Sequence, residues 1–527
     1  MTQDARAKPA TGVWKAPAIT ALLLVLLAMA VQGQDANWDL RNYHLYTPSA
    51  LLDGRFMSDI AVAQLQTWHN PVLDLPFAWM VRAGLPGWLV SLWLGLPAFI
   101  ALLFALRLLD LLWPTRHGAL RTALAGLVAT TGAAVMPSIG TTFNDAMVAA
   151  GVMAALWWAV DSQGRRGPWA TWIPAGLMAG LVAGLKLTGA LYCLGFIAAA
   201  LVAGPLRGLP LRLFALAVGG VAGAALTAGP WAAYLWQEHG NPLFPYFNEW
   251  FLSPDALPQG HKDERFVPQG LDALLVPFHL LAASTRFSEG KLADPRILLG
   301  FVALVGWWVS AWRARRKRHD GMTTTHGVLA FALVSFAAWV DLYGIYRYLF
   351  ALELACSIAI IGMLSQWLPA RFHRTALVVA AALLVGATHR PNWERRPFSS
   401  PMVDVRVPTL PAGSLVVLAH DDPLGYAVPY LPADVSAVSI RNNFMAPSRC
   451  TRLQARAEQR IRQHAGAIYL LRMAPGTSRH DEPYRAYGLV RGDACLPLPT
   501  SLGMLELCPL VRGTPTSVVC AATPLDP

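Results

Sequence analysis

The stretch Gln34–Asn70, QDANWDLRNYHLYTPSALLDGRFMSDIAVAQLQTWHN, decides how the rest of the chain is interpreted. It follows an apolar run over residues 16–33 and is crowded with Asp, Arg, His, Tyr and Trp. Two carboxylates, Asp35 and Asp39, come shortly after the end of that run. Most of the remaining chain is apolar, so we expect it to hold this polar loop beside a membrane surface.

The composition is typical of a membrane protein. Of the 527 residues, 55% are hydrophobic and 14% are charged, whereas a soluble globular protein carries about 25% charged residues. Apolar runs of roughly 17–25 residues, long enough to span a bilayer, recur along the chain. We expect a polytopic α-helical membrane protein with about eleven spans, near residues 16–33, 87–113, 119–137, 145–161, 170–185, 189–204, 212–232, 296–312, 327–342, 349–368 and 375–389.

The net charge of +11 comes from Lys and Arg scattered over short connections, which is where the positive-inside rule places them. No basic helix interleaved with aromatic residues is present, so we expect no nucleic-acid partner. The cations of the N-terminal tail and of alternate connections, including the cluster at residues 313–318, predict a cytoplasmic N-terminus. The first run has no A-x-A cleavage site before Gln34, so we expect it to be a retained helix. With an odd number of spans, the C-terminus is then extracytoplasmic.

The sequence predicts two domains. Residues 1–391 form a multi-spanning domain with a first outward loop over 34–86, in which 71–86 is an interfacial helix, and a long outward loop over 237–295. Residues 392–527 form a small extracytoplasmic α/β domain, with short strands in SLVVLA, SAVSI, AIYLLRM and GMLELCPLV and an amphipathic helix over 451–466. Four cysteines of this domain are disulfide candidates whose connectivity stays open: Cys450, Cys495, Cys508 and Cys520.

Ionisable groups in or beside apolar spans are costly, which makes them candidates for function. On the predicted outward side these are Asp39 with its neighbour Asp35, Asp145, Lys186, and Arg347 with Asp341. Each has a simpler explanation. Asp39 could cap a helix, and Asn144 could cap the helix that Asp145 begins. Lys186 could extend to lipid headgroups, and Arg347 could belong to an interfacial aromatic belt.

Aromatic and polar side chains accompany Asp39. If a helix starts there, Tyr43 and Tyr46 follow on one face at i+4 and i+7, where they suit a sugar. We expect Arg41, Tyr43, His44, Tyr46, Asn144 and Tyr346 to line a substrate site, although His44 is more often a structural hydrogen-bond donor.

These features together resemble the GT-C superfamily of integral-membrane glycosyltransferases. The resemblance rests on the first loop, the Asn144-Asp145 helix start, and the runs GLKLTG, GNPLFPYFN and YGIYRYL, and it covers roughly residues 16–390. The family often has a D-E-x-x-Y-like pattern in its first loop, but here Leu40 replaces the second acid of Asp39-Leu40-Arg41-Asn42-Tyr43. Asp35 therefore remains a rival to Asp39.

The resemblance implies transfer of a sugar from a polyprenyl-phosphate-type donor on the outer face of a bacterial-type cytoplasmic membrane. Asp39 would then be the catalytic carboxylate, and Asp145 a second acid or, as in metal-dependent members, a ligand of a divalent cation. Lys186 and Arg347 would hold the carrier phosphate. The partners implied are the lipid-linked donor, membrane lipid, and a glycan, lipid or protein acceptor. A transporter or lipid flippase and a non-catalytic envelope assembly protein are the alternatives.

Overall fold

The computed structural model describes residues 14–114, 118–315, 322–369, 371–474 and 482–514. The chain divides into two compact units. The first, called the helical unit, comprises the chain up to Gln32 together with Leu94–Gly229 and Asp263–Trp393. The second, called the sheet unit, comprises Gly33–Trp93, Pro230–Lys262 and the chain from Glu394 onward. The C-terminal segment is thus grouped with the first loop, a division that the sequence did not predict.

Each of the predicted spans coincides with a helix of the structure. These helices are α1 (Lys15–Gln32), α4 (Gly87–Leu112), α5 (Gly118–Thr130), α7 (Asp145–Ser162), α8 (Pro168–Leu185), α9 (Ala190–Val202), α10 (Leu209–His239), α13 (Arg296–Arg315), α14 (Met322–Leu342), α15 (Phe350–Trp367) and α16 (His373–Gly386). Within the described residues, seven helices are long and apolar enough to cross a membrane, and three apolar helices are shorter. The chain is therefore a multi-pass membrane protein.

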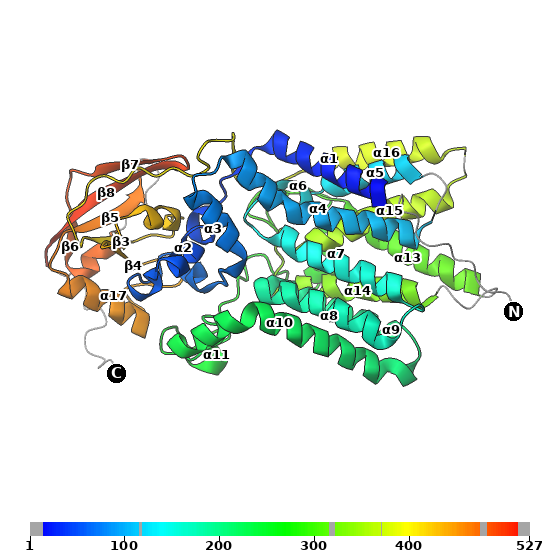
Figure 1. The fold of residues 1–527 in the computed structure, drawn as a ribbon, viewed down its shortest axis with the longest axis horizontal. Helices are drawn as coiled ribbons and strands as arrows, with labels where there is room; N and C mark the ends of the chain where they lie inside the picture. The colour runs from blue at the N-terminus through cyan, green and yellow to red at the C-terminus, as the bar shows by residue number, and fades with distance from the viewer. Residues whose placement is uncertain (1–13, 115–117, 316–321, 370, 475–481, 515–527) are drawn as a thin grey trace. The chain divides into compact units, whose positions relative to one another are not determined.

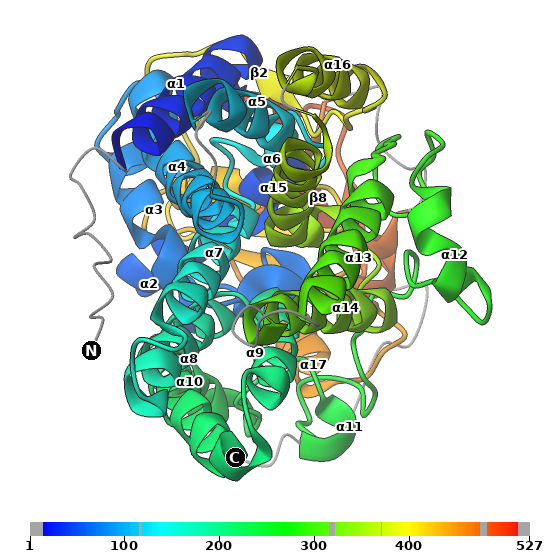
Figure 2. The same cartoon turned by 90° about the vertical axis from the view of Figure 1, so that its right-hand side faces the viewer.

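Helix α15 is the central helix of the helical unit. It contacts α5, α7, α13 and α16, and Figure 2 shows α5, α13 and α16 around it. Nearly all its residues are buried, which agrees with an apolar sequence on every side of the helix. Close packing requires glycine at two contacts, because a Cβ on Gly300 would lie 2.2 Å from Cys356 Cβ and one on Gly362 would lie 2.5 Å from the Trp113 ring.

Helices α8 and α10 approach each other closely through small residues. A Cβ added to Gly176 or Gly180 would lie within 2.2 Å of a main-chain oxygen of α10, and one added to Gly219 would lie 2.1 Å from the Ile173 carbonyl. Small residues at i, i+4 spacing are a common device for packing membrane helices. This contact fixes α8, and α8 ends immediately before Lys186.

The sheet unit contains a six-stranded mixed sheet in the order β4-β3-β5-β8-β6, with β7 also paired to β8 (Figure 1). The strands are β3 (Leu415–Leu418), β4 (Ser436–Ser439), β5 (Ile468–Met473), β6 (Leu489–Arg491), β7 (Leu496–Thr500) and β8 (Gly503–Arg512). Strands β3, β4 and β5 are parallel, and β8 is antiparallel to its neighbours. Helix α17 (Arg452–Gln463) connects β4 to β5.

The four predicted strands and the predicted helix of this region are confirmed. The sequence missed β6 and β7. Strand β7 reads LPLPT, and its two prolines cannot donate to a ladder, so such a segment is tolerated at the edge of a sheet.

The first loop belongs to the same core as this sheet. Its elements are β1 (Gln34–Asp35), η2 (Leu40–His44), α2 (Tyr46–Leu52), η3 (Arg55–Met57), η4 (Gln64–Trp68), η5 (Val72–Asp74) and α3 (Leu75–Arg82). Ile60 forms a parallel bridge with Val438, and its carbonyl accepts the Ser439 amide at 2.9 Å. Ile60 and Trp68 pack in one hydrophobic cluster with Leu415 and Val438. Strand β1 pairs with β2 (Arg395–Arg396), which follows α16 in the sequence.

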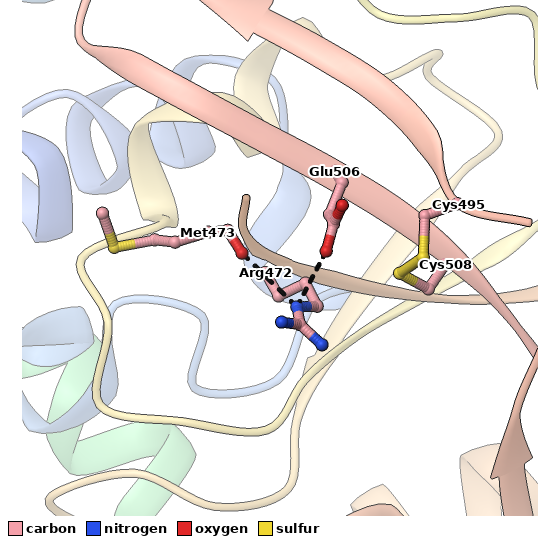
Figure 3. The surroundings of a disulfide bond; sticks show 5 residues. All are labelled: Arg472, Met473, Cys495, Glu506 and Cys508. Carbon is pink, nitrogen blue, oxygen red and sulfur yellow. Dashed lines mark hydrogen bonds and ion pairs between the residues drawn. A yellow bond between two sulfur atoms is a disulfide. The ribbon is translucent and has the colours of Figure 1, made fainter. Parts of the chain in front are cut away.

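A disulfide confirms part of the cysteine prediction. Cys495, just before β7, is bonded to Cys508 of β8, close to the ion pair between Arg472 and Glu506 (Figure 3). Cys450 is also disulfide-bonded, and Cys520 lies outside the described residues. Cys193 and Cys356 are free thiols.

Candidate active site

Three predicted residues from distant parts of the sequence meet in the helical unit. Asp145 is the first residue of α7, Lys186 follows α8, and Arg347 lies in η8 (Tyr346–Leu349), directly before α15. One oxygen of Asp145 pairs with Lys186 Nζ, and the other accepts Arg347 Nη1 at 3.1 Å. All three side chains are at least four-fifths buried. We call this group the Asp145 cluster, and it contains two cations for one carboxylate.

Aromatic rings and main-chain oxygens complete the surroundings of the two cations. Lys186 Nζ donates to the Phe143 carbonyl at 2.5 Å. The Arg347 guanidinium lies 4.4 Å from the centre of the Phe143 ring and 4.9 Å from that of Tyr348. Tyr192 fixes the Tyr348 main chain by donating to its carbonyl at 2.7 Å. The simpler explanations for Lys186 and Arg347 are therefore incomplete, because both cations point into protein rather than to lipid headgroups.

Asn144 has a backbone role instead of the predicted capping role. Its φ is +64°, in the left-handed region, and its side chain makes no capping hydrogen bond to α7. Asparagine adopts this conformation more readily than most residues. Its carbonyl accepts the amides of Met147 and Val148 at the start of α7. The left-handed turn lets the Phe143 carbonyl and the Asp145 carboxylate both face Lys186.

Two buried acids that the sequence interpretation missed hold the segment before Asp145. Asp294 accepts the Ala133 amide at 2.8 Å, and Glu353 accepts the amides of Ala134 and Val135 at 2.9 and 3.1 Å. These amides begin α6 (Val135–Ser138), and Asp294 is itself paired with Arg296 at 3.0 Å. The signal was present, since Glu353 is an acid inside an apolar span. Both acids are fully satisfied by protein groups, so they are positioning residues.

In the sheet unit, Asp39 lies next to Tyr43 as the i+4 spacing predicted. The Tyr43 hydroxyl donates to Asp39 Oδ2 at 3.4 Å. Asp39 does not cap a helix, because it already has helical dihedral angles and its side chain makes no capping bond. Asn37 caps instead, since its Oδ1 accepts the Leu40 amide at 2.7 Å.

Asp35, the rival of Asp39, is tied to the backbone. It is fully buried, and its Oδ1 accepts the Asn37 amide at 3.1 Å. It lies opposite Arg395 in the β1–β2 pair. Burial lowers the pKa of Arg395, and the charge of Asp35 opposes that effect. These contacts favour a structural role for Asp35 and leave Asp39 as the better candidate.

Tyr46 differs from the predicted arrangement. The residues Leu40–His44 form a wider π-type turn, which changes the register after Tyr43. The Tyr46 hydroxyl donates to Asp59 at 3.1 Å, and Asp59 also pairs with Arg55 at 2.8 Å. Burial raises the pKa of Asp59, and Arg55 opposes that rise. Tyr46 is fully buried here, so it supports the loop rather than the face that carries Asp39.

The remaining predicted residues have definite partners. His44 Nδ1 lies 2.6 Å from Asp74 Oδ2, and both side chains are buried. Arg41 pairs with Glu394. Tyr346 is fully buried, and its amide donates to the Phe287 carbonyl at 2.8 Å. Asp341 is exposed. Asp74 was not among the predicted site residues, although it precedes a short helix at the edge of an aromatic segment.

A metal centre finds little support in the donor groups. Among the described residues, one group of His, Cys, Asp or Glu side chains has the spacing of metal ligands, and it consists of Cys495, Glu506 and Cys508. Both its sulfur atoms are taken by the disulfide. At Asp145 each oxygen already accepts a cationic side chain.

The fold is that of a polytopic helical membrane protein with a C-terminal mixed β-sheet region, and its helical unit contains the buried Asp145 cluster. The chain matches no protein-family model and no curated protein. It is similar to two crystal structures of ArnT from Cupriavidus metallidurans, one bound to undecaprenyl phosphate and one in the apo state. Both have 16% sequence identity and a TM-score of 0.44 and cover 71% of this chain.

The chain covers 64% and 63% of these two chains, respectively, and the likeness is one of fold.

Proposed function

We propose that this protein is a membrane glycosyltransferase that moves a sugar from a polyprenyl-phosphate-type lipid to an acceptor hydroxyl. The observation that carries the proposal is the Asp145 cluster. Two cations, Lys186 and Arg347, meet at one carboxylate in a buried setting. Arginine matches phosphate oxygens with two parallel donors, and lysine adds a point charge. Such a site suits the phosphate of a lipid carrier that approaches from the membrane.

The aromatic rings of Phe143 and Tyr348 fit this assignment. They lie against the Arg347 guanidinium and restrict its plane, so that fewer side-chain conformations are lost when an anion binds. Asp145 holds Lys186 and Arg347 close together. In this proposal Asp145 is therefore a positioning carboxylate rather than the catalytic base, and no divalent cation is needed at its oxygens.

Asp39 is proposed as the base. The acceptor oxygen forms a bond to the anomeric carbon of the sugar while the bond from that carbon to the phosphate oxygen breaks. The electron pair of the broken bond leaves with the phosphate, where Lys186 and Arg347 neutralise it. The proton of the acceptor hydroxyl passes to Asp39, whose orientation is fixed by the Tyr43 hydroxyl.

The site is proposed to open on the outer face of a bacterial-type cytoplasmic membrane, with a cytoplasmic N-terminus and an extracytoplasmic C-terminus. The charges of the short connections support this orientation. The disulfide between Cys495 and Cys508 supports it independently, because such bonds persist in oxidising compartments.

The test is sugar transfer by the purified chain in proteoliposomes, with a synthetic polyprenyl-phosphate sugar as donor and a panel of glycan, lipid and peptide acceptors. We expect product that depends on both Asp39 and Arg347. Uptake of the donor across the bilayer without any product, unchanged in Asp39→Asn and Arg347→Met, would overturn the proposal in favour of a transporter.

A further inference from the structure

A short aromatic turn of the sheet unit exposes more apolar surface than its surroundings. The turn consists of residues 247–252, which read FNEWFL and include helix α11 (Asn248–Phe251). Trp250 is 74% exposed and Leu252 is 64% exposed. Exposed apolar groups of this size, when they cluster, mark a surface that meets another apolar phase.

The backbone conformation of the turn keeps these side chains exposed. Phe247 and Leu252 have φ values of +55° and +54°, a conformation that bulky residues adopt only when their surroundings impose it. Asn248 imposes it. Its buried amide donates to the carbonyls of Ser253, Ala256 and Leu257 at 3.0 to 3.2 Å, and its Oδ1 accepts the Ser253 amide at 2.8 Å. The protrusion of Trp250 is thus a fixed property of the fold.

The base of the turn is fixed as well. Asp255 accepts Arg452 Nε of α17 at 2.8 Å and pairs with His239 Nδ1 at 2.8 Å. Within the turn, the Phe247 and Trp250 rings stack with their centres 5.6 Å apart. The Phe251 ring meets Trp236 edge-on at 6.2 Å. The turn and Trp236 therefore form one aromatic surface, which we call the 236–252 surface.

Trp236 shows which phase this surface meets. It lies near the end of α10, a candidate membrane span whose Phe214, Val221 and Leu226 are mostly exposed. A helix of 31 residues is about 46 Å long, whereas the hydrocarbon core is about 30 Å thick, so its end reaches the interfacial layer. The polar residues 237–239 follow Trp236 at once. Tryptophan is enriched at this depth of a membrane.

We propose that the 236–252 surface is a membrane-interface anchor that inserts Trp250 and Leu252 into the boundary between lipid headgroups and acyl chains. Trp236 itself belongs to α10, so the surface lies at the end of a candidate membrane span. The anchor would fix the loop 230–262, and α17 through Asp255, at a set height above the lipid. This inference concerns the bilayer alone and does not depend on the reaction proposed above.

The test uses spin labels on the full chain in proteoliposomes of phosphatidylethanolamine and phosphatidylglycerol. Single cysteines replace Trp250 or Leu252 in a background with Cys193→Ala and Cys356→Ala and the disulfides intact. Glu249→Cys, in the same turn, and Gln259→Cys, on the exposed chain that follows, are matched controls. Collision rates are measured with oxygen, which concentrates in lipid, and with a water-soluble nickel chelate.

We expect oxygen to collide several-fold more often than the nickel chelate at positions 250 and 252, and the reverse at positions 249 and 259. Nickel collisions at 250 and 252 as frequent as at 259 would overturn the anchor, because the surface would then face water. Low collision rates with both reagents at 250 and 252 would also overturn it, since they would indicate cover by protein, from a second copy or another partner.

Discussion

The candidate carboxylates of the two units have different hydrogen-bond and ion-pair partners. In the helical unit Asp145 lies between Lys186 and Arg347 and pairs with both. In the sheet unit Asp39 accepts a hydrogen bond from the uncharged hydroxyl of Tyr43. The proposed function gives anion binding to the Asp145 cluster and proton transfer to Asp39.

The largest effect is expected for Asp39→Asn. The substitution keeps the shape of the side chain and its contact with Tyr43 but removes the proton acceptor. We expect sugar transfer to fall by about 10²–10⁴-fold, the typical contribution of a positioned base, with an unchanged melting temperature. The matched control is Asp53→Asn, which alters an exposed acid of the same loop that pairs with Arg82. Full activity in Asp39→Asn would show that Asp39 is not the proton acceptor.

A somewhat smaller effect is expected for Arg347→Met. It removes a cation aimed at the departing phosphate, and losses of one such group cost about 10²–10³-fold in rate. Arg347→Lys should recover only part of this activity, because lysine cannot make the bidentate contact. The control is Arg286→Met, an exposed arginine of the helical unit that pairs with Asp272. Equal activity of Arg347→Met and the control would exclude phosphate binding at the Asp145 cluster.

Asp255 is a third carboxylate, and it also belongs to the sheet unit. It is paired with a cation, and its role is to stabilise the fold. Burial raises its pKa, but the hydrogen bonds from Arg452 and His239 outweigh burial and lower the pKa to about 2, below its ordinary value. Its contribution to stability is therefore complete above about pH 4 and is lost as the pH falls toward 2.

We expect Asp255 to contribute about 1–2 kcal/mol to unfolding of the sheet unit, allowing for the solvent exposure of Arg452. The measurement is denaturation of the sheet unit within the whole chain between pH 2.5 and 6, with Asp255→Asn for comparison. The variant should lose stability at pH 6 and show a flatter pH dependence. Parallel curves for both proteins would contradict the pairing.

The smallest effect is expected for Asp74→Asn. The bond between His44 Nδ1 and Asp74 becomes a neutral one, which should cost about 1–2 kcal/mol and lower the melting temperature by about 2–5 °C. Transfer should fall less than tenfold, as for a structural pair. A loss as large as that of Asp39→Asn, at an unchanged melting temperature, would instead place His44 in proton transfer.

Local sequence patterns predicted the positions of the helices and the individual candidate residues. Apolar runs predicted a helix at each of the eleven positions, and the cost of charge in such runs pointed to Asp145, Lys186 and Arg347. The same rule should have included Glu353, which lies in the first turn of a span. Tyr43 followed from helical spacing, but Tyr46 did not, because the π-type turn over Leu40–His44 shifts the register by local geometry that no spacing rule contains.

Long-range pairing could not be predicted from one sequence. No local sequence feature at Ile60 indicates that it pairs with Val438, and none at Lys186 indicates that it pairs with Asp145. The shared core of the first loop and the sheet is the main consequence. Removing the chain from Glu394 onward would take away Val438 beside Ile60 and Phe444 beside Trp68, so such a deletion would damage the predicted active-site loop as well as the sheet.

The most direct test measures binding and transfer separately in the same two variants. Undecaprenyl phosphate is titrated onto the purified wild type, Asp39→Asn and Arg347→Met, and sugar transfer is measured on the same preparations. We predict that Asp39→Asn binds the lipid as the wild type does but transfers sugar about 10²–10⁴-fold more slowly, and that Arg347→Met is impaired in both binding and transfer. Wild-type binding by Arg347→Met, or loss of binding in Asp39→Asn, would contradict the division of roles between the two carboxylates.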